Sequence, residues 1–277
     1  GKLDTNSITN CSSSLNISLS VTDSSGSGEN GNTVTQSNTG GIVGGFENSS
    51  YASVSQCAYS GTITTSGTGA FINLGGIVGI AGTISNCTTS GAINMAGGRM
   101  ENVGGIAGRV YSSTTNCISN MSITLNSNAN KYGISNIQYV GGLVGNGVTI
   151  TNCTTNGTIT ASASNSFDSY YAQINYVGGL VGTAYTISSS SASGAINIKS
   201  GKSAQYVGGI AGYLRNGVNK SYSTMNISVT PEGQNIGGLA GYGYSTTINQ
   251  CYSTGNVTAA NSSYVGGFLG YGASKID

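Results

Sequence analysis

The stretch VGGLVGNGVTITNCTTNGTIT, at Val140–Thr160, decides the fold of this chain because close copies of it recur. The copies LGGIVGIAGTISNCTTSGAIN and VGGLVGTAYTISSSSASGAIN occupy Leu74–Asn94 and Val177–Asn197. The rest of the chain consists of looser copies and of the segments between them. Self-similarity at a nearly fixed spacing indicates a repeat architecture in which each unit stacks on its neighbours.

Eight units can be recognised by the Gly-Gly pair with which each begins. The pairs are Gly40–Gly41, Gly75–Gly76, Gly104–Gly105, Gly141–Gly142, Gly178–Gly179, Gly208–Gly209, Gly237–Gly238 and Gly266–Gly267. A second column contains cysteine or serine, at Cys11, Cys57, Cys87, Cys117, Cys153, Ser190, Ser221 and Cys251. A third column, six residues further on, contains Ile17, Ile63, Ile93, Ile123, Ile159, Ile196, Ile227 and Val257.

The columns predict three short strands in each unit. The first is the Gly-Gly segment itself, the second is the TITNC-like segment, and the third is the short segment around the isoleucine column. In the second strand, strict alternation would turn Ile150 and Asn152 to one side and Thr151 and Cys153 to the other. Segments this short and this rich in Gly, Thr and Ser do not favour helices. Unusual backbone angles are expected at a corner before the third strand, at Gly91, Gly157, Gly194 and Gly255.

Identical coils stacked in register bury apolar side chains that a single strand cannot bury. We therefore predict an all-β fold, a parallel β-solenoid of about eight coils that forms a single domain over residues 1–277. The crossover rule favours a right-handed solenoid. Stacking at about 4.8 Å per coil gives a rod about 38 Å long. Three long variable segments, residues 18–38, 124–139 and 160–176, are expected on one face, which in repeat proteins is often the binding face.

Composition excludes several functions. The net charge is +1 and 6% of the residues are charged, so no basic face can neutralise the phosphates of a nucleic acid. No apolar run is long enough to span a membrane. The chain has no histidine, its acidic residues are well separated, and the Gly-Gly pairs lack the spacing of nucleotide-binding loops. We expect neither an enzyme nor a bound cofactor or metal.

The repeats resemble those of a known family. VGGLVGNGVTITNCTTNGTIT and IGGLAGYGYSTTINQCYSTGNVT are similar to GLUG-motif repeats, which occur in bacterial surface adhesins and other large cell-surface proteins. The resemblance covers nearly the whole chain and implies an extracellular or cell-surface β-solenoid. It implies no catalytic residue. Ser190 and Ser221 depart from the cysteine pattern, so cysteine is not indispensable to a coil.

The cysteine column allows two interpretations. Stacking in register brings neighbouring Cα atoms to about 4.8 Å, within the range of disulfide bonds. Disulfides such as Cys11–Cys57 or Cys87–Cys117 are therefore feasible. The alternative is a ladder of buried free thiols that act as small apolar groups. The residues concerned are Cys11, Cys57, Cys87, Cys117, Cys153 and Cys251.

Two other sets of side chains are candidate binding surfaces. Tyr139, Tyr176, Tyr206 and Tyr264 each precede a Val-Gly-Gly, and they would line a sugar-binding or partner surface or else form ladders that stabilise the coil. Hydroxyl and amide side chains flank the isoleucine column, as at Thr62/Thr64, Ser122/Thr124, Thr158/Thr160 and Asn256/Thr258. A regular hydroxyl ladder is typical of ice-binding solenoids, although here the rows are mixed and also fit a solvated face.

The two ends of the sequence are complementary parts of one unit. Ile8–Ser18 supplies a second and third strand, and Val265–Gly270 supplies a first strand. Because neither end carries a polar cap, we expect copies to stack head to tail into an open filament, with Cys251 of one copy near Cys11 of the next. The expected interface contains Ile8, Cys11, Ile17, Val265, Phe268 and Leu269. The alternative is a piece of a longer adhesin whose other parts provide the caps.

The sequence therefore predicts an extracellular structural protein whose main partner is another copy of itself. The first alternative is a carbohydrate- or host-binding adhesin segment that contacts cell-surface glycans through the long variable segments. The second alternative is an ice-binding protein.

Overall fold

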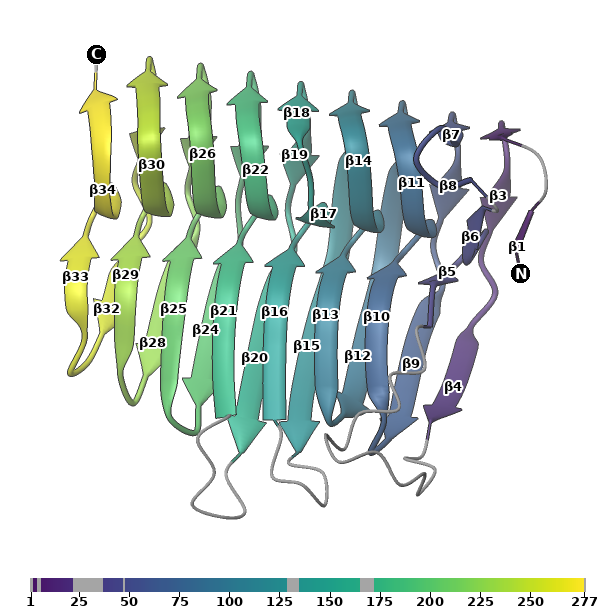
Figure 1. Ribbon diagram of the computed structural model, residues 1–277, viewed down its shortest axis with the longest axis horizontal. Coiled ribbons are helices and arrows are strands. Elements are labelled where there is room, and N and C mark those ends of the chain that lie inside the picture. The colour runs from purple at the N-terminus through teal and green to yellow at the C-terminus, as the bar shows by residue number, and fades with distance from the viewer. Residues whose placement is uncertain are drawn as a thin grey trace.

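A computed structural model of the chain describes residues 2–3, 6–21, 37–46, 48–128, 135–164 and 172–276. The described residues form strands, turns and bends without a helix. Equivalent strands of successive coils pair in parallel, so the molecule is the predicted all-β solenoid. Its coils lie side by side along one axis, with the two ends of the chain at opposite ends of the rod (Figure 1).

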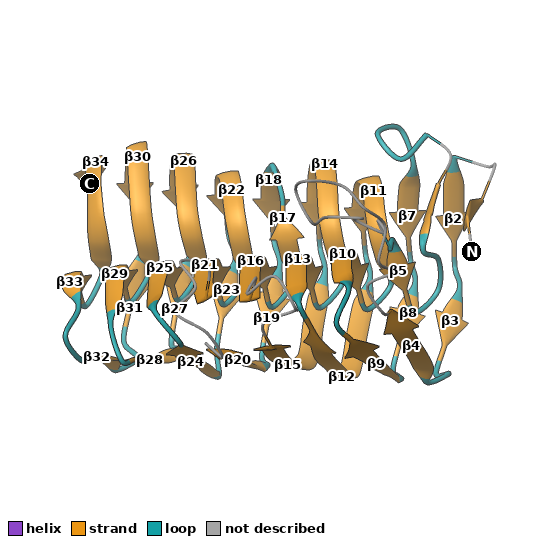
Figure 2. Cartoon of the chain, turned by 60° about the horizontal axis from the view of Figure 1, so that its bottom comes forward, coloured by secondary structure: helices purple, strands orange, loops and turns teal. Residues whose placement is uncertain are grey.

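Three sheets run along the rod, and each coil contributes to them in turn (Figure 2). The first sheet contains the residues before each Gly-Gly pair. Its strands are β5 (Thr39–Gly40), β10 (Ala70–Gly75), β13 (Arg99–Gly104), β16 (Ser135–Gly141), β21 (Ala172–Gly178), β25 (Ser203–Gly208), β29 (Gly233–Gly237) and β33 (Ser263–Gly266).

The second sheet begins after each Gly-Gly pair and ends before the cysteine column. Its strands are β2 (Ser7–Thr9), β7 (Ser53–Ser55), β11 (Val78–Ser85), β14 (Ala107–Thr115), β17 (Val144–Asn146), β18 (Thr149–Thr151), β22 (Val181–Ser188), β26 (Ala211–Asn219), β30 (Ala240–Asn249) and β34 (Leu269–Ile276).

The third sheet follows the cysteine column and includes the isoleucine column. Its strands are β3 (Ser12–Ser13), β4 (Ile17–Val21), β8 (Ala58–Tyr59), β9 (Thr62–Gly67), β12 (Thr88–Gly97), β15 (Ile118–Asn128), β19 (Thr154–Thr155), β20 (Thr158–Ser164), β23 (Ser191–Ala192), β24 (Ala195–Ser200), β27 (Tyr222–Ser223), β28 (Asn226–Thr230), β31 (Tyr252–Ser253) and β32 (Val257–Ala259). A separate short pair joins β1 (Lys2–Leu3) to β6 (Gly45–Phe46).

The core fills the space between the three sheets with stacked columns of identical or similar side chains. Ile93 pairs in register with Ile63 on one side and with Ile123 on the other, and all three are fully buried. The hydrophobic contribution of each coil is realised only when its neighbours cover it, because these columns bury apolar surface between coils.

The prediction that each Gly-Gly segment is one strand is wrong. The segment is the corner between the first and second sheets, since β13 ends at Gly104 and β14 begins at Ala107. Successive corners touch through their backbones. A Cβ on Gly105 would lie 2.1 Å from the carbonyl oxygen of Gly142 in the next coil, so only glycine fits.

The prediction of strict alternation in the second strand is also wrong. Ile150 and Cys153 are both fully buried, because Asn152 between them adopts a left-handed conformation with φ of 52°. This turn at the corner brings Cys153 back to the inner side. Asparagine tolerates the conformation, and its side chain donates a 2.8 Å hydrogen bond from Nδ2 to Oδ1 of Asn116 in the preceding coil.

The glycines expected at the next corner divide into two kinds. Gly91 and Gly194 have φ of 107° and 116°, in the region that favours glycine. Gly157 and Gly255 are needed for space instead, because a Cβ would lie 1.9 Å from the carbonyl oxygen of Met121 and 1.8 Å from that of Met225.

The long variable segments, residues 18–38, 124–139 and 160–176, lie partly outside the described residues. Their described parts extend the sheets, since β15 continues to Asn128 and β21 begins at Ala172. The strands of the first sheet lie in the segments that vary most between units. For this reason the sequence did not predict the first sheet as a separate layer.

Candidate functional site

The corner between the first and second sheets carries a row of residues that lie two positions before the Gly-Gly pairs, from Gly75–Gly76 onward. We call it the corner row, and it contains Asn73, Asn102, Tyr139, Tyr176, Tyr206, Asn235 and Tyr264. Each adopts a left-handed conformation, with φ between 53° at Asn102 and 59° at Tyr206. Such a conformation is rare for a ring-bearing residue, so the coil must impose it.

Close backbone packing explains this conformation. A Cβ on Gly182 would lie 2.7 Å from the carbonyl oxygen of Tyr176, and one on Gly212 would lie 2.5 Å from that of Tyr206. The glycine that follows each Gly-Gly pair by three residues, such as Gly182 or Gly212, therefore packs directly against the backbone of the corner row. Tyr176 and Tyr206 remain partly exposed and line the outer side of the corner.

A second row lies beside the corner row on the second sheet. This adjacent row is held in register by the parallel strands and contains Ile80, Arg109, Asn146, Thr183, Tyr213, Tyr242 and Tyr271. Sequence reasoning missed it, although Tyr213, Tyr242 and Tyr271 occupy one fixed position after the Gly-Gly pair. That fixed position was the signal that would have revealed it.

The tyrosines of the two rows pack as two stacks that meet edge to face. The ring centroids of Tyr139 and Tyr176 are 4.9 Å apart, as are those of Tyr176 and Tyr206, with interplanar angles of 9°. In the adjacent row the rings of Tyr213 and Tyr242 stack at 5.2 Å. The ring of Tyr213 stands at 76° to that of Tyr176, with the centroids 6.1 Å apart. Both geometries are favourable for aromatic pairs and hold the rings in fixed positions.

A cleft of about 330 Å³ opens between the two stacks. We call it the tyrosine cleft, and it is lined by Tyr139, Tyr176, Thr183, Tyr206, Tyr213, Arg215 and Tyr242. Its volume lies at the lower end of the range for small-molecule sites. Burial raises the pKa of both Tyr176 and Tyr213, so their phenols stay protonated and can donate hydrogen bonds at neutral pH.

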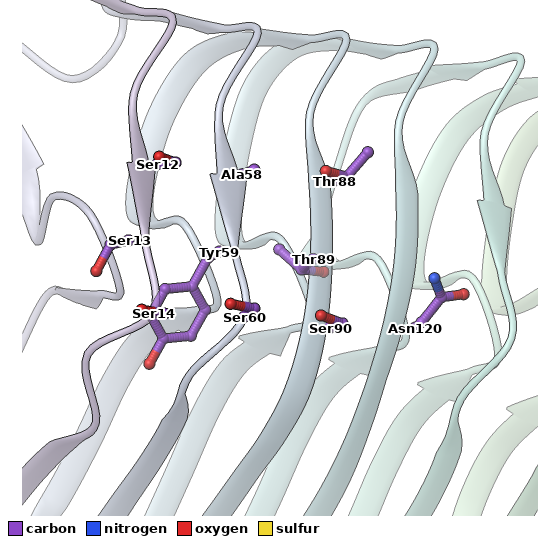
Figure 3. A pocket seen from close by; sticks show the side chains of 10 residues that line it. All are labelled: Ser12, Ser13, Ser14, Ala58, Tyr59, Ser60, Thr88, Thr89, Ser90 and Asn120. Atoms are coloured by element: carbon purple, nitrogen blue, oxygen red, sulfur yellow. The ribbon is translucent and has the colours of Figure 1, made fainter.

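A second, larger groove lies on the third sheet near the N-terminal end of the rod (Figure 3). Its volume is about 400 Å³, and its lining is Ser12, Ser13, Ser14, Ala58, Tyr59, Ser60, Thr88, Thr89, Ser90 and Asn120. Tyr59 is only 2% exposed, and its hydroxyl donates a 2.9 Å hydrogen bond to the carbonyl oxygen of Leu15. The groove therefore offers small hydroxyl groups but no accessible ring face.

The six cysteines are free thiols, and four of them are buried. Each thiol donates to the carbonyl oxygen two residues earlier, as from Cys117 to Thr115 at 3.2 Å. Ser190 makes the same bond to Ser188 at 2.7 Å, which explains why serine can occupy this column. A hydrogen bond with the thiol of Cys153, together with burial, raises the pKa of Cys117 to about 12. Such a thiol is a poor nucleophile at neutral pH.

The predicted interface residues lie at the two ends of the rod (Figure 1). Ile8, Cys11 and Ile17 lie in or beside β2 and β4, whereas Val265, Phe268 and Leu269 lie in or beside β33 and β34. All except Val265 pack against the core as partly buried side chains. One chain does not bring the two groups together, so their contact would require a second copy.

The candidate ice-binding row is irregular. The residues in register along the third sheet are Thr64, Asn94, Thr124, Thr160, Asn197, Ser228 and Thr258. Hydroxyl and amide side chains follow one another in this row without a regular pattern. Ice binding stays a prediction that this geometry does not favour.

Among the described residues, no group of three or more Cys, Asp or Glu side chains is arranged to hold a metal ion. Nor do these residues include a helix long and apolar enough to cross a membrane.

Fold and surface together define a parallel β-solenoid whose coils carry an aromatic cleft on one corner. Residues 232–258 match the family described as the GLUG motif. The matched segment spans one coil, from Glu232, just before β29, into β32. The preceding and following coils pair with it in register. The match shows that the chain contains a GLUG motif, and it supports the predicted GLUG-repeat protein. No curated protein and no solved structure matches it.

Proposed function

We propose that this protein is a segment of a cell-surface adhesin that binds carbohydrate in the tyrosine cleft and acts without catalysis. The observation that carries the proposal is the cleft itself, which is lined by two stacks of tyrosine rings together with Thr183. Tyrosine combines an apolar ring with a hydroxyl group, and sugars combine apolar C–H faces with hydroxyl groups. The serine- and threonine-lined groove lacks the ring component.

The solenoid supports binding by keeping the cleft rigid. The corner-row tyrosines of the cleft belong to paired strands of successive coils, and their left-handed backbones are packed against glycines. A preformed site loses little conformational entropy when a ligand binds. A single coil could not form the cleft, because residues from several coils line it.

A glycan array tests this proposal with the full chain and a matched pair of variants. We expect binding by the native chain, and loss of binding in Thr183→Tyr, which fills the cleft. The control Thr64→Tyr introduces the same ring on the third sheet and should bind as the native chain does. Absence of binding to any glycan, or equal binding by both variants, would contradict the proposal.

Filament assembly by end-to-end stacking is a second proposed function. The specific observation in its favour is the apolar surface of the C-terminal coil, where Val265 is 44% exposed and Ile276 is 58% exposed. A neighbouring copy placed in register would bury these side chains and pair with β34, because an open strand edge is a template for further pairing.

Sedimentation velocity and electron microscopy at increasing concentration test this second proposal. We expect filaments from the native chain and their loss in Val265→Lys. Ile118→Lys is the matched control, because Ile118 is 43% exposed but lies midway along the rod. A chain that remains monomeric at high concentration would exclude the proposal.

A further inference from the structure

The row of rings that forms one wall of the tyrosine cleft ends abruptly. Tyr213 pairs in register with Tyr242 on one side and with Thr183 on the other. Tyr242 stacks on one face of the Tyr213 ring, whereas the next position in the row is occupied by a small side chain. Beyond Thr183 follows Asn146, which is also small and accepts a 3.2 Å hydrogen bond from the Thr183 hydroxyl. Of these two residues only Thr183, which is 7% exposed, lines the tyrosine cleft, so the ring stack of the adjacent row ends inside the cleft. The space beside Tyr213 at this point suits a ring supplied by a ligand.

A cation lies beside this space. The guanidinium of Arg215 is 5.8 Å from the ring centroid of Tyr213 and 5.7 Å from that of Tyr185. Guanidinium groups stack on aromatic rings and still present N–H donors in their own plane. Arg215 therefore lies over the rings and lines the cleft, where its N–H groups can pair with an anionic ligand.

No acidic side chain of the described residues neutralises Arg215. The described acids are Glu101, which forms an ion pair with Arg99, and Glu232, which lines a different groove on the first sheet with Gln205. The other lining residues of the cleft are tyrosines and one threonine, and none of them carries a carboxyl group. The cleft thus combines ring faces, hydroxyl donors and one cation that no acid of the described part of the chain neutralises.

We infer that the tyrosine cleft selects sugars that carry a carboxylate, with the carboxylate on Arg215 and the sugar ring beside Tyr213. This inference rests on the proposed carbohydrate binding. A carboxylate matches the guanidinium in charge and in geometry, since two parallel N–H···O bonds can form. A neutral sugar of the same shape could not form this ion pair with Arg215.

Calorimetric titration with matched acid and ester probes tests the inference. The probes are trisaccharides of galacturonate, glucuronate and mannuronate, each as the free acid and as the uncharged methyl ester. At least one acid should bind the full chain about tenfold or more tightly than its ester, and added salt should narrow the difference. Arg215→Gln should remove the preference for the acid, while Arg215→Lys should keep part of it.

Arg109→Gln is the matched control. Arg109 belongs to the same sheet and also lies over a tyrosine ring, that of Tyr111 at 4.8 Å, but it is outside the cleft. This variant should keep the preference. Equal affinity for every acid and its ester, or equal loss in both arginine variants, would overturn the inference. Binding to neutral glycans alone would overturn it and leave the proposed function intact, whereas absence of any glycan binding would remove both.

Discussion

The corner row differs between the N-terminal coils, which carry Asn73 and Asn102, and the three middle coils, which carry Tyr139, Tyr176 and Tyr206. At Asn73 and Asn102 the side chains are only 8% and 3% exposed, and they form an amide ladder. Asn102 donates a 2.8 Å hydrogen bond from Nδ2 to Oδ1 of Asn73, which donates in turn to Asn38 at 2.9 Å. At Tyr139, Tyr176 and Tyr206 the same position carries stacked rings that line an open cleft.

The backbone at this corner is the same in both regions, with φ of 57° at Asn73 and 58° at Tyr176. The difference therefore lies in the side chains alone. Asparagine closes the corner with buried hydrogen bonds, whereas tyrosine leaves partly exposed rings that line a cleft. One backbone thus serves stability in one region and, on our proposal, recognition in the other.

The largest effect is expected from the glycines that both regions share. Gly105→Ala and Gly142→Ala each place a Cβ 2.1 Å from a carbonyl oxygen of the next coil. Each variant should lose about 3 kcal/mol of unfolding free energy or more, measured by chemical denaturation. Gly267→Ala is the control, because no atom lies within 4 Å of its added Cβ. If only one of the two variants loses much unfolding free energy, the asparagine and tyrosine regions do not both need glycine at this corner.

The asparagine ladder should contribute to stability and not to binding. Asn102→Ala leaves the buried Oδ1 of Asn73 without its donor, so we expect a loss of about 1–3 kcal/mol of unfolding free energy. Glycan binding by the folded variant should be unchanged. If this variant keeps full stability, the amide ladder is not what closes the corner.

The tyrosines of the corner row should contribute more to glycan binding than to stability. Tyr176→Asn keeps a residue that tolerates the left-handed conformation but removes a ring that stacks at 4.9 Å on both neighbours. Unfolding free energy should fall by about 1 kcal/mol, as expected for lost aromatic contacts, while array binding should be abolished. If this variant still binds glycans as the native chain does, the proposed division between a stabilising asparagine region and a binding tyrosine region is wrong.

The cysteine column provides the smallest expected effect. Cys117→Ser should change the unfolding free energy by about 1 kcal/mol or less, because Ser190 and Ser221 already make the equivalent hydrogen bond in later coils. A loss of several kcal/mol would show that the thiol packs in a way that serine cannot replace.

The same thiol predicts a dependence on pH. The pKa of Cys117 is raised from 9.0 to about 12 in the folded chain, so the unfolded chain releases this proton first as pH increases. Its contribution to stability is fully present below pH 9 and is lost progressively between pH 9 and pH 12. Native Cys117 should therefore resist alkylation near pH 8 and react once the chain unfolds. Rapid alkylation of the folded chain would contradict this.

The sequence predicted the solenoid because the cysteine and isoleucine columns repeat at matching intervals, and in-register stacking follows directly from them. The prediction from the sequence was wrong at the corners. The VGG segment has the pattern of a strand, and only the close contact between Gly105 and Gly142 in the structure reveals that it is a corner. The turn at Asn152 was missed for a similar reason, because alternation assumes an extended backbone.

The cleft was predicted only in part. Tyr139, Tyr176 and Tyr206 were recognised by their place before Val-Gly-Gly, but their partners Tyr213 and Tyr242 were not. The two rows meet because the backbone turns at the Gly-Gly corner, which the predicted continuous strand did not allow. Arg215 occurs in a single unit, so no repeated pattern could reveal it.

The most direct test compares the two regions in one titration followed by NMR. The native chain, labelled on its tyrosine rings and asparagine side-chain amides, is titrated with the glycan that binds best on the array. The account predicts shifts for Tyr176, Tyr206 and Tyr213, with the amides of Asn73 and Asn102 unchanged. Shifts at the asparagine ladder instead, or none at the tyrosines while the glycan binds, would contradict it.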